Sequence, residues 1–161
     1  MELDILIVRW IHILSATILF GTGIGTAFHG LASNLRGDVP SLAIANRNVV
    51  LADWLFTTPA VIVQPATGFW LAYRLGWPLD SGWIVWSLIL YLFVGACWLP
   101  VVWLQIRMQR MADEAVAAGT PLPARYHRYF RLWFALGWPA FGAMLVIFWL
   151  MVARPDLWSL L

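Results

Sequence analysis

Four long apolar stretches, divided by short polar segments, set the hydropathy pattern of this chain. Asp, Glu, Lys and Arg are missing between Arg9 and Arg36, between Asp80 and Arg107, and between Arg131 and Arg154, and only Asp53 interrupts the stretch from Arg47 to Arg74. A helix of roughly 20 apolar residues is long enough to cross the hydrocarbon core of a bilayer. The pattern therefore predicts transmembrane helices near residues 6–31, 50–73, 83–106 and 132–153.

The polar segments are too short to fold by themselves, so we expect one integral membrane domain over residues 1–161. Its predicted fold class is all-α, a polytopic four-helix transmembrane bundle. Composition agrees, because 62% of the residues are hydrophobic and 11% are charged, whereas soluble domains carry about a quarter charged residues. Cys97 is the single cysteine, which excludes disulfides within the chain and cysteine-based metal clusters. The net charge of +2 gives no argument for nucleic acid, and the expected partner is the lipid bilayer.

Arginine sets the predicted orientation, because the chain contains no lysine. The connections over residues 32–49 and 107–131 hold seven of the ten basic residues, namely Arg36, Arg47, Arg107, Arg110, Arg125, Arg128 and Arg131. Connections rich in arginine face the cytoplasm in most membrane proteins. We therefore expect a bacterial inner-membrane protein with both termini in the periplasm.

Polar residues recur at helical spacing in the first two stretches. The first stripe consists of His12, Ser15, Leu19, Thr22, Thr26 and His29, and the second of Asp53, Thr57, Ala60, Gln64 and Thr67. Each set falls on one side of a helix. Polar groups in hydrocarbon need partners, so both stripes, and Gln105 in the third stretch, are expected to face the bundle interior.

The three histidines are the candidate ligands of a cofactor. Haem b suits a helical bundle, where axial imidazoles hold its iron between helices. His29 with His127 is one candidate pair, and His12, with Met151 opposite, is a candidate for a second haem. Each residue also has a simpler interpretation: His29 and His127 as histidines hydrogen-bonded at the headgroup level, and Asp53 as the partner of Arg47 or Arg107 in an ion pair.

Several runs of the sequence resemble a family of small bacterial predicted integral membrane proteins. They are WIHILSATILFGTGIGTAFHG, DWLFTTPAVIVQPATGFWLA, CWLPVVWLQIRM and WFALGWPAFGAMLVIFWLMV. The resemblance covers nearly the whole chain and implies a four-span inner-membrane protein. More distantly, WIH followed by a glycine-rich span is similar to the small membrane protoporphyrinogen oxidase and the copper-resistance D proteins. In that oxidase a first-helix histidine, matched by His12, and a later lysine hold haem, and this chain has no lysine.

Two classes of function follow from these observations. In the first, histidines of the first helix bind haem b for electron transfer or tetrapyrrole handling inside the membrane, with quinone as one candidate partner. In the second, the protein is a non-catalytic accessory subunit that docks on other membrane protein subunits. The chain has no nucleotide-binding or hydrolase motif, so whether it is an enzyme depends on the first interpretation.

Overall fold

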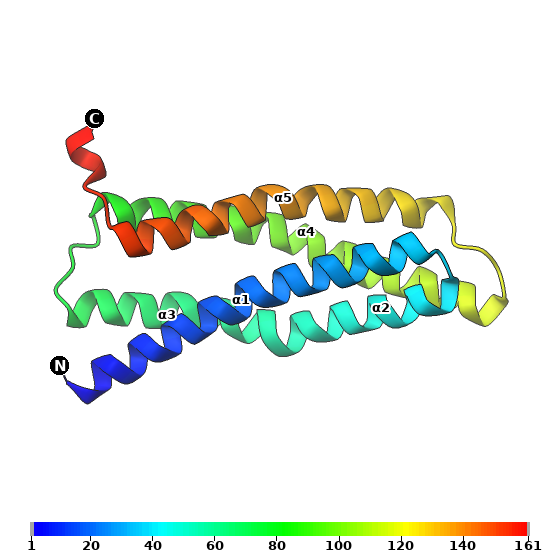
Figure 1. Cartoon of the computed structure of the whole chain (residues 1–161), viewed down its shortest axis with the longest axis horizontal. Coiled ribbons are helices and arrows are strands. Elements are labelled where there is room, and N and C mark those ends of the chain that lie inside the picture. Colours follow the sequence, from blue (N-terminus) through cyan, green and yellow to red (C-terminus); the bar gives the residue numbers. More distant parts are fainter. Residues whose placement is uncertain (1, 161) are drawn as a thin grey trace.

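The chain forms an all-α bundle in a computed structural model that describes residues 2–160 (Figure 1). Helix α1 spans Leu3–Arg36, α4 spans Gly82–Ala118, α5 spans Ala124–Ala153, and a short 3-10 helix, η2, spans Leu157–Leu160. The remaining long helix is composite: α2 (Val39–Ala52), the π-helix η1 (Asp53–Thr57) and α3 (Thr58–Arg74) follow one another without a break. Four helices are long and apolar enough to cross a membrane, which confirms the predicted four-helix bundle.

The helices run well beyond the predicted spans. They have 34, 36, 37 and 30 residues, and at about 1.5 Å per residue they exceed the ~30 Å hydrocarbon core. The connection predicted over residues 32–49 is almost entirely helical, because only Gly37 and Asp38 separate α1 from α2. The excess length lies at the end of the bundle that contains this turn and the α4–α5 turn, which we call the arginine-rich end.

Local chemistry explains the tight turn between α1 and α2. Gly37 adopts a left-handed conformation with φ of 80°, which glycine tolerates without steric cost. Asp38 then caps α2, since its carboxylate accepts from the Ser41 backbone N–H over 2.8 Å. The backbone and side-chain hydrogen bonds from Ser41 lower the pKa of Asp38.

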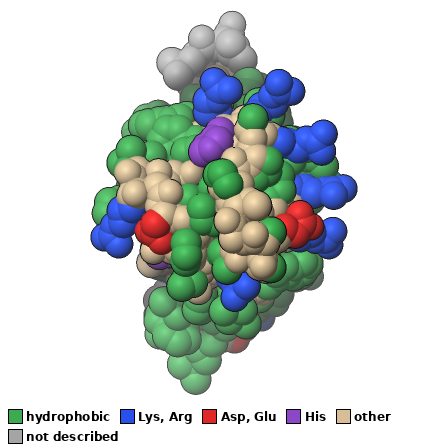
Figure 2. All heavy atoms as spheres, turned by 90° about the vertical axis from the view of Figure 1, so that its right-hand side faces the viewer, with side chains coloured by type: hydrophobic (Ala, Val, Ile, Leu, Met, Phe, Trp, Pro, Cys, Tyr) green, Lys and Arg blue, Asp and Glu red, His purple; other side chains and the backbone are tan. Residues whose placement is uncertain are grey.

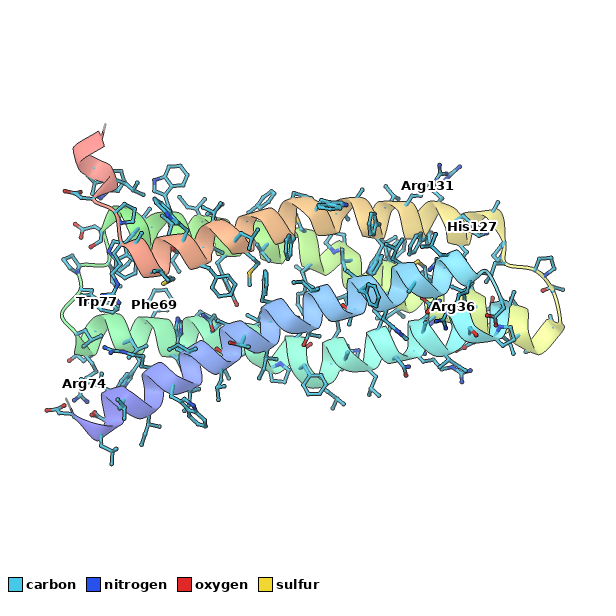
Figure 3. All side chains as sticks on the ribbon, in the orientation of Figure 1. Arg36, Phe69, Arg74, Trp77, His127 and Arg131 are labelled. Carbon is cyan, nitrogen blue, oxygen red and sulfur yellow. The ribbon has the colours of Figure 1, made fainter. Side chains whose placement is uncertain are left out.

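The most tightly packed core lies at the arginine-rich end. Tyr126 is fully buried there and accepts hydrogen bonds from the side-chain amides of Asn46 (3.0 Å) and Asn34 (3.5 Å). The apolar members of this core come from α2, α4 and α5: Leu42, Ala43, Val49, Leu104, Met108, Ala112 and Trp133. Figure 3 shows Arg36, His127 and Arg131 at this end, and Figure 2 shows arginines along its rim.

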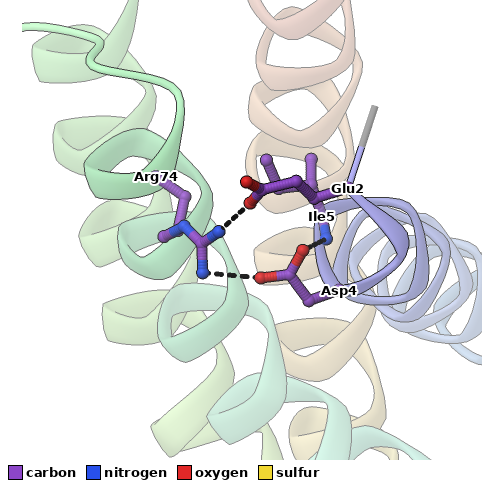
Figure 4. Close-up of polar contacts among 4 residues, drawn as sticks. All are labelled: Glu2, Asp4, Ile5 and Arg74. Carbon is purple, nitrogen blue, oxygen red and sulfur yellow. Dashed lines mark hydrogen bonds and ion pairs between the residues drawn. The ribbon is translucent and has the colours of Figure 1, made fainter.

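Towards the other end, where both termini lie, the bundle separates into two helix pairs (Figure 1). α1 packs on α3, and α4 packs on α5. Phe20 of α1 stacks on Phe141 of α5 at 5.1 Å between ring centroids, which joins the pairs near mid-height. At the end of the α1–α3 pair, Arg74 forms ion pairs with Glu2 and Asp4 (Figure 4).

The π-helix η1 has a direct cause in the sequence. Pro59 has no N–H and its ring would collide with the carbonyl four residues earlier in a regular α-helix. The chain instead widens by one residue, and the Thr58 N–H bonds to the Asp53 carbonyl five residues before it. Such π-turns occur frequently at functional sites.

Candidate functional site

Among the described residues, two polar clusters lie within the spans predicted from the sequence, and the first joins α1 to α3. His12 Nδ1 is 2.8 Å from Thr67 Oγ1, and His12 Nε2 is 3.1 Å from Gln64 Nε2. The Ser15 hydroxyl is hydrogen-bonded to Gln64 Oε1. Ser15 is buried, and the other three side chains are half-buried. The two polar stripes predicted from the sequence therefore meet at these four residues.

The hydrogen bonds of this cluster define the tautomer of His12. The Thr67 hydroxyl donates its single proton to a backbone carbonyl, with Val63 O at 2.7 Å and Gln64 O at 3.1 Å. With its proton in that position it accepts from His12, which places the imidazole proton on Nδ1. The Ser15 hydroxyl lies within hydrogen-bond distance of both the His12 carbonyl oxygen and Gln64 Oε1. With Oε1 turned towards Ser15, the Gln64 amide donates to His12 Nε2. This network assigns a neutral imidazole with its lone pair on Nε2.

A glycine allows the two helices to approach at this point. A Cβ added to Gly68 would lie 3.2 Å from His12 Cε1, which is closer than side chains normally pack. The absence of a side chain at Gly68 thus lets the Cε1 edge of the His12 ring approach α3, within reach of Gln64 and Thr67.

The second cluster surrounds Asp53, the first residue of η1. Asp53 is 7% exposed and accepts a 2.8 Å hydrogen bond from Thr57 Oγ1 at Oδ1. The side chains of Gln105 and Trp98, both from α4, lie next to its carboxyl group. Gln105 is 4% exposed, so the expectation that Asp53 and Gln105 face protein agrees with the structure.

The alternative interpretation of Asp53, an ion pair with Arg47 or Arg107, is wrong. Arg47 instead pairs with Asp113 of α4 at 2.8 Å. The Arg107 guanidinium lies over the Trp103 ring, 5.4 Å from its centroid. Arg47 precedes Asp53 by six residues, which is not a spacing that brings two side chains to one face of a helix.

The expectation that His29 faces the bundle interior is also wrong, because its side chain is exposed. A stripe with a repeat of 3.5 residues drifts around an α-helix by about 20° per heptad, or about 50° over the 17 residues from His12 to His29. His127 is exposed as well, and its ring packs edge-on against Tyr126. Among the described residues, no three His, Cys, Asp or Glu side chains are placed to share a metal ion.

Sequence reasoning missed several polar residues that the structure brings inside. Trp98 was not singled out, because one tryptophan among twelve gives no positional signal. Tyr126, Asn34 and Asn46 join three helices at the arginine-rich end, although they lie outside the predicted spans. Pro59 was the available signal for the π-turn that carries Asp53.

Comparison with known proteins gives one family and nothing more specific. The family model described as predicted integral membrane protein (DUF2269) matches residues 6–155. No curated protein and no solved structure shows a significant match to the chain.

Proposed function

The chain belongs to the family of predicted integral membrane proteins DUF2269, and we propose that His12 would hold haem b in its four-helix bundle. Bound haem would supply one-electron redox chemistry, which serves electron transfer or tetrapyrrole handling inside the membrane. The single observation that carries this proposal is the hydrogen-bonded state of His12.

That state is the one that metal ligation requires. A ligating histidine is neutral and binds through an unprotonated ring nitrogen. In most metalloproteins its other nitrogen donates to an oxygen that fixes the ring. In the tautomer assigned from this network His12 meets both conditions, because Nδ1–H donates to Thr67 Oγ1 and Nε2 carries the lone pair.

Gln64 has a defined part in this proposal. Its amide donates to His12 Nε2, so it must turn away before that nitrogen can bind iron. The side chain is half-buried and keeps its Ser15 contact as an alternative anchor. The proposal uses His12 as the single protein ligand, because His29 and His127 are exposed and have no contact with this cluster in the described part of the chain.

The proposal includes a location and an orientation. We place the protein in a bacterial inner membrane with its arginine-rich end in the cytoplasm and both termini in the periplasm. The charge distribution supports this orientation, since seven arginines lie near the α1–α2 and α4–α5 turns. His12 would then lie in the periplasmic half of the bundle, next to Thr67 of α3.

An optical spectrum of the detergent-purified protein from haem-replete cells tests the proposal. We expect a Soret band, and a reduced spectrum after dithionite, that disappear in His12→Ala and persist in His29→Ala and His127→Ala. Thr67→Val should retain haem and shift its reduction potential, because the orienting hydrogen bond is lost.

Two results would contradict the proposal. A wild-type protein without a Soret band would leave the accessory subunit of a larger membrane assembly as the better interpretation. A Soret band that survives His12→Ala in a folded variant would assign the ligand to another residue.

A further inference from the structure

Asp53 is a buried carboxylic acid that the His12 cluster does not use. It lies in η1, four residues before Thr57 and eleven residues before Gln64 of the His12 cluster, and about 10 Å separates Thr57 from Gln64 along the helix axis at 1.5 Å per residue. Its Oδ1 accepts from Thr57, whereas its Oδ2 is buried and has no hydrogen-bond partner. Half of the carboxyl group is therefore available to another molecule.

Two more buried polar atoms lie on side chains next to this carboxyl, and neither atom makes a hydrogen bond of normal geometry. They are the indole nitrogen Nε1 of Trp98 and the amide oxygen Oε1 of Gln105. Trp98 and Gln105 are seven residues apart, which is two helical turns, so they present their side chains from one face of α4. One donor and two acceptors thus converge between η1 and α4.

No positive charge accompanies this group of atoms among the described residues. Arg47 is paired with Asp113, and Arg107 lies over the Trp103 ring. Along α1 no charged residue occurs between Arg9 and Arg36, and His12 is bound to α3 while His29 is exposed. α5 has no charged residue between Arg131 and Arg154.

The donor and acceptor atoms of this site determine which hydrogen bonds a bound molecule must make. It must donate two hydrogen bonds, to Asp53 Oδ2 and Gln105 Oε1, and accept one from the Trp98 N–H. A water molecule offers this combination, and buried waters typically make about three hydrogen bonds to polar groups that lack protein partners. We propose that Asp53, Trp98 and Gln105 bind a water molecule inside the bundle, at the π-turn of the second span.

The proposed water site would give the π-helix η1 a function in addition to accommodating Pro59. The π-turn holds the Asp53 carboxyl inside the bundle, and the bound water connects it to α4 without an ion pair. Ordered water is one of the partners that satisfy polar groups at membrane depth where a helix is broken or widened. The site is independent of haem, since neither His12 nor its partners contact these three side chains in the described structure.

Water-edited NMR of ¹⁵N-tryptophan-labelled protein in lipid nanodiscs tests the inference directly. We expect magnetisation transfer from water to the Trp98 indole N–H and none to the Trp133 indole N–H. Trp133 is the matched control, because its Nε1 is also buried without a partner, while its six-membered ring packs against Gly30 and its side chain belongs to the apolar core. Trp98→Phe and Trp133→Phe assign the two resonances.

The variants sharpen the test. Gln105→Leu and Asp53→Leu should each reduce the Trp98 transfer to background while the other tryptophan resonances keep their positions. Wild-type protein with no transfer to Trp98, or with equal transfer to Trp98 and Trp133, would overturn the proposal even if neither variant folds. Unchanged transfer from water to the Trp98 indole N–H in His12→Ala would show that the water site is independent of the His12 cluster. Loss of that transfer in a folded His12→Ala variant would contradict the independence of the two sites.

Discussion

The Tyr91 hydroxyl of α4 donates a 2.5 Å hydrogen bond to the Val61 carbonyl of α3. Pro65, four residues later in α3, cannot supply the backbone N–H that this carbonyl would otherwise accept. In a regular α-helix the N–H of residue 65 would bond to this carbonyl, but proline has none. A free carbonyl inside a membrane bundle is costly, and a neighbouring helix often supplies the missing donor. Tyr91 also joins α3 to α4, which have few other contacts.

We predict that Tyr91→Phe destabilises the bundle by about 1–2 kcal/mol, because the Val61 carbonyl loses its donor. In a Pro65→Ala background the helix supplies its own N–H, and the same substitution should cost much less. The double-mutant cycle can be measured by reversible unfolding in mixed micelles. Equal costs in both backgrounds would show that the Tyr91 hydroxyl does not replace the bond removed by Pro65.

The apolar stretches were sufficient to predict the four spans. Helical spacing was sufficient to predict that the polar stripes turn inward at His12, Ser15, Gln64 and Thr67. His12 and Ser15, like Gln64 and Thr67, are three residues apart, so their direction depends only on local helix geometry. The prediction that His29 faces the bundle interior was wrong, because small differences between the assumed and the real helical repeat accumulate over 17 residues. The Tyr91–Val61 bond joins residues 30 positions apart, and its existence depends on how two helices cross, which no local pattern encodes.

The N-terminal turn of α1 is expected to be held by charge. Arg74 pairs with Glu2 and with Asp4 (Figure 4), and these are partly exposed side chains. Arg74→Gln should cost no more than about 1 kcal/mol, because exposed ion pairs are weak and screened by salt. It should nevertheless loosen the contact between the ends of α1 and α3.

Spin labels at residues 3 and 75 provide the measurement for Arg74. We expect the distance distribution to broaden in Arg74→Gln, and in wild-type protein at high salt. Arg154→Gln is the matched control, since Arg154 lies over the Trp77 ring at the same end of the bundle, 4.2 Å from its centroid. An unchanged distribution in Arg74→Gln would indicate that packing alone holds α1.

The orientation in the membrane can be tested with reporter fusions. Ala118 ends α4 at the arginine-rich end, and Gly82 begins the same helix at the opposite end. A fusion after Ala118 should report the cytoplasm, and a fusion after Gly82 should report the periplasm. The reverse pattern would place His12 in the cytoplasmic half and would contradict the orientation that we propose.

Gly68 should control the geometry of the His12 ring. An alanine Cβ at this position would lie 3.2 Å from His12 Cε1, so Gly68→Ala must push the imidazole away from α3. We expect longer hydrogen bonds to Thr67 and Gln64, and a mixture of the two tautomers in place of the Nδ1–H form. The ¹⁵N chemical shifts of His12 in selectively labelled protein report this tautomer balance.

Gly95→Ala is the matched control for Gly68→Ala, because a Cβ at Gly95 has no neighbour within 4 Å. Replacing a helical glycine by alanine in open space stabilises a helix by about 0.5–1 kcal/mol. Gly95→Ala should therefore raise stability and leave the His12 shifts unchanged, whereas Gly68→Ala should forfeit that gain and move them. Identical His12 shifts in the two variants would mean that the imidazole is not confined by α3, and the tautomer that supports metal ligation would lose its structural basis.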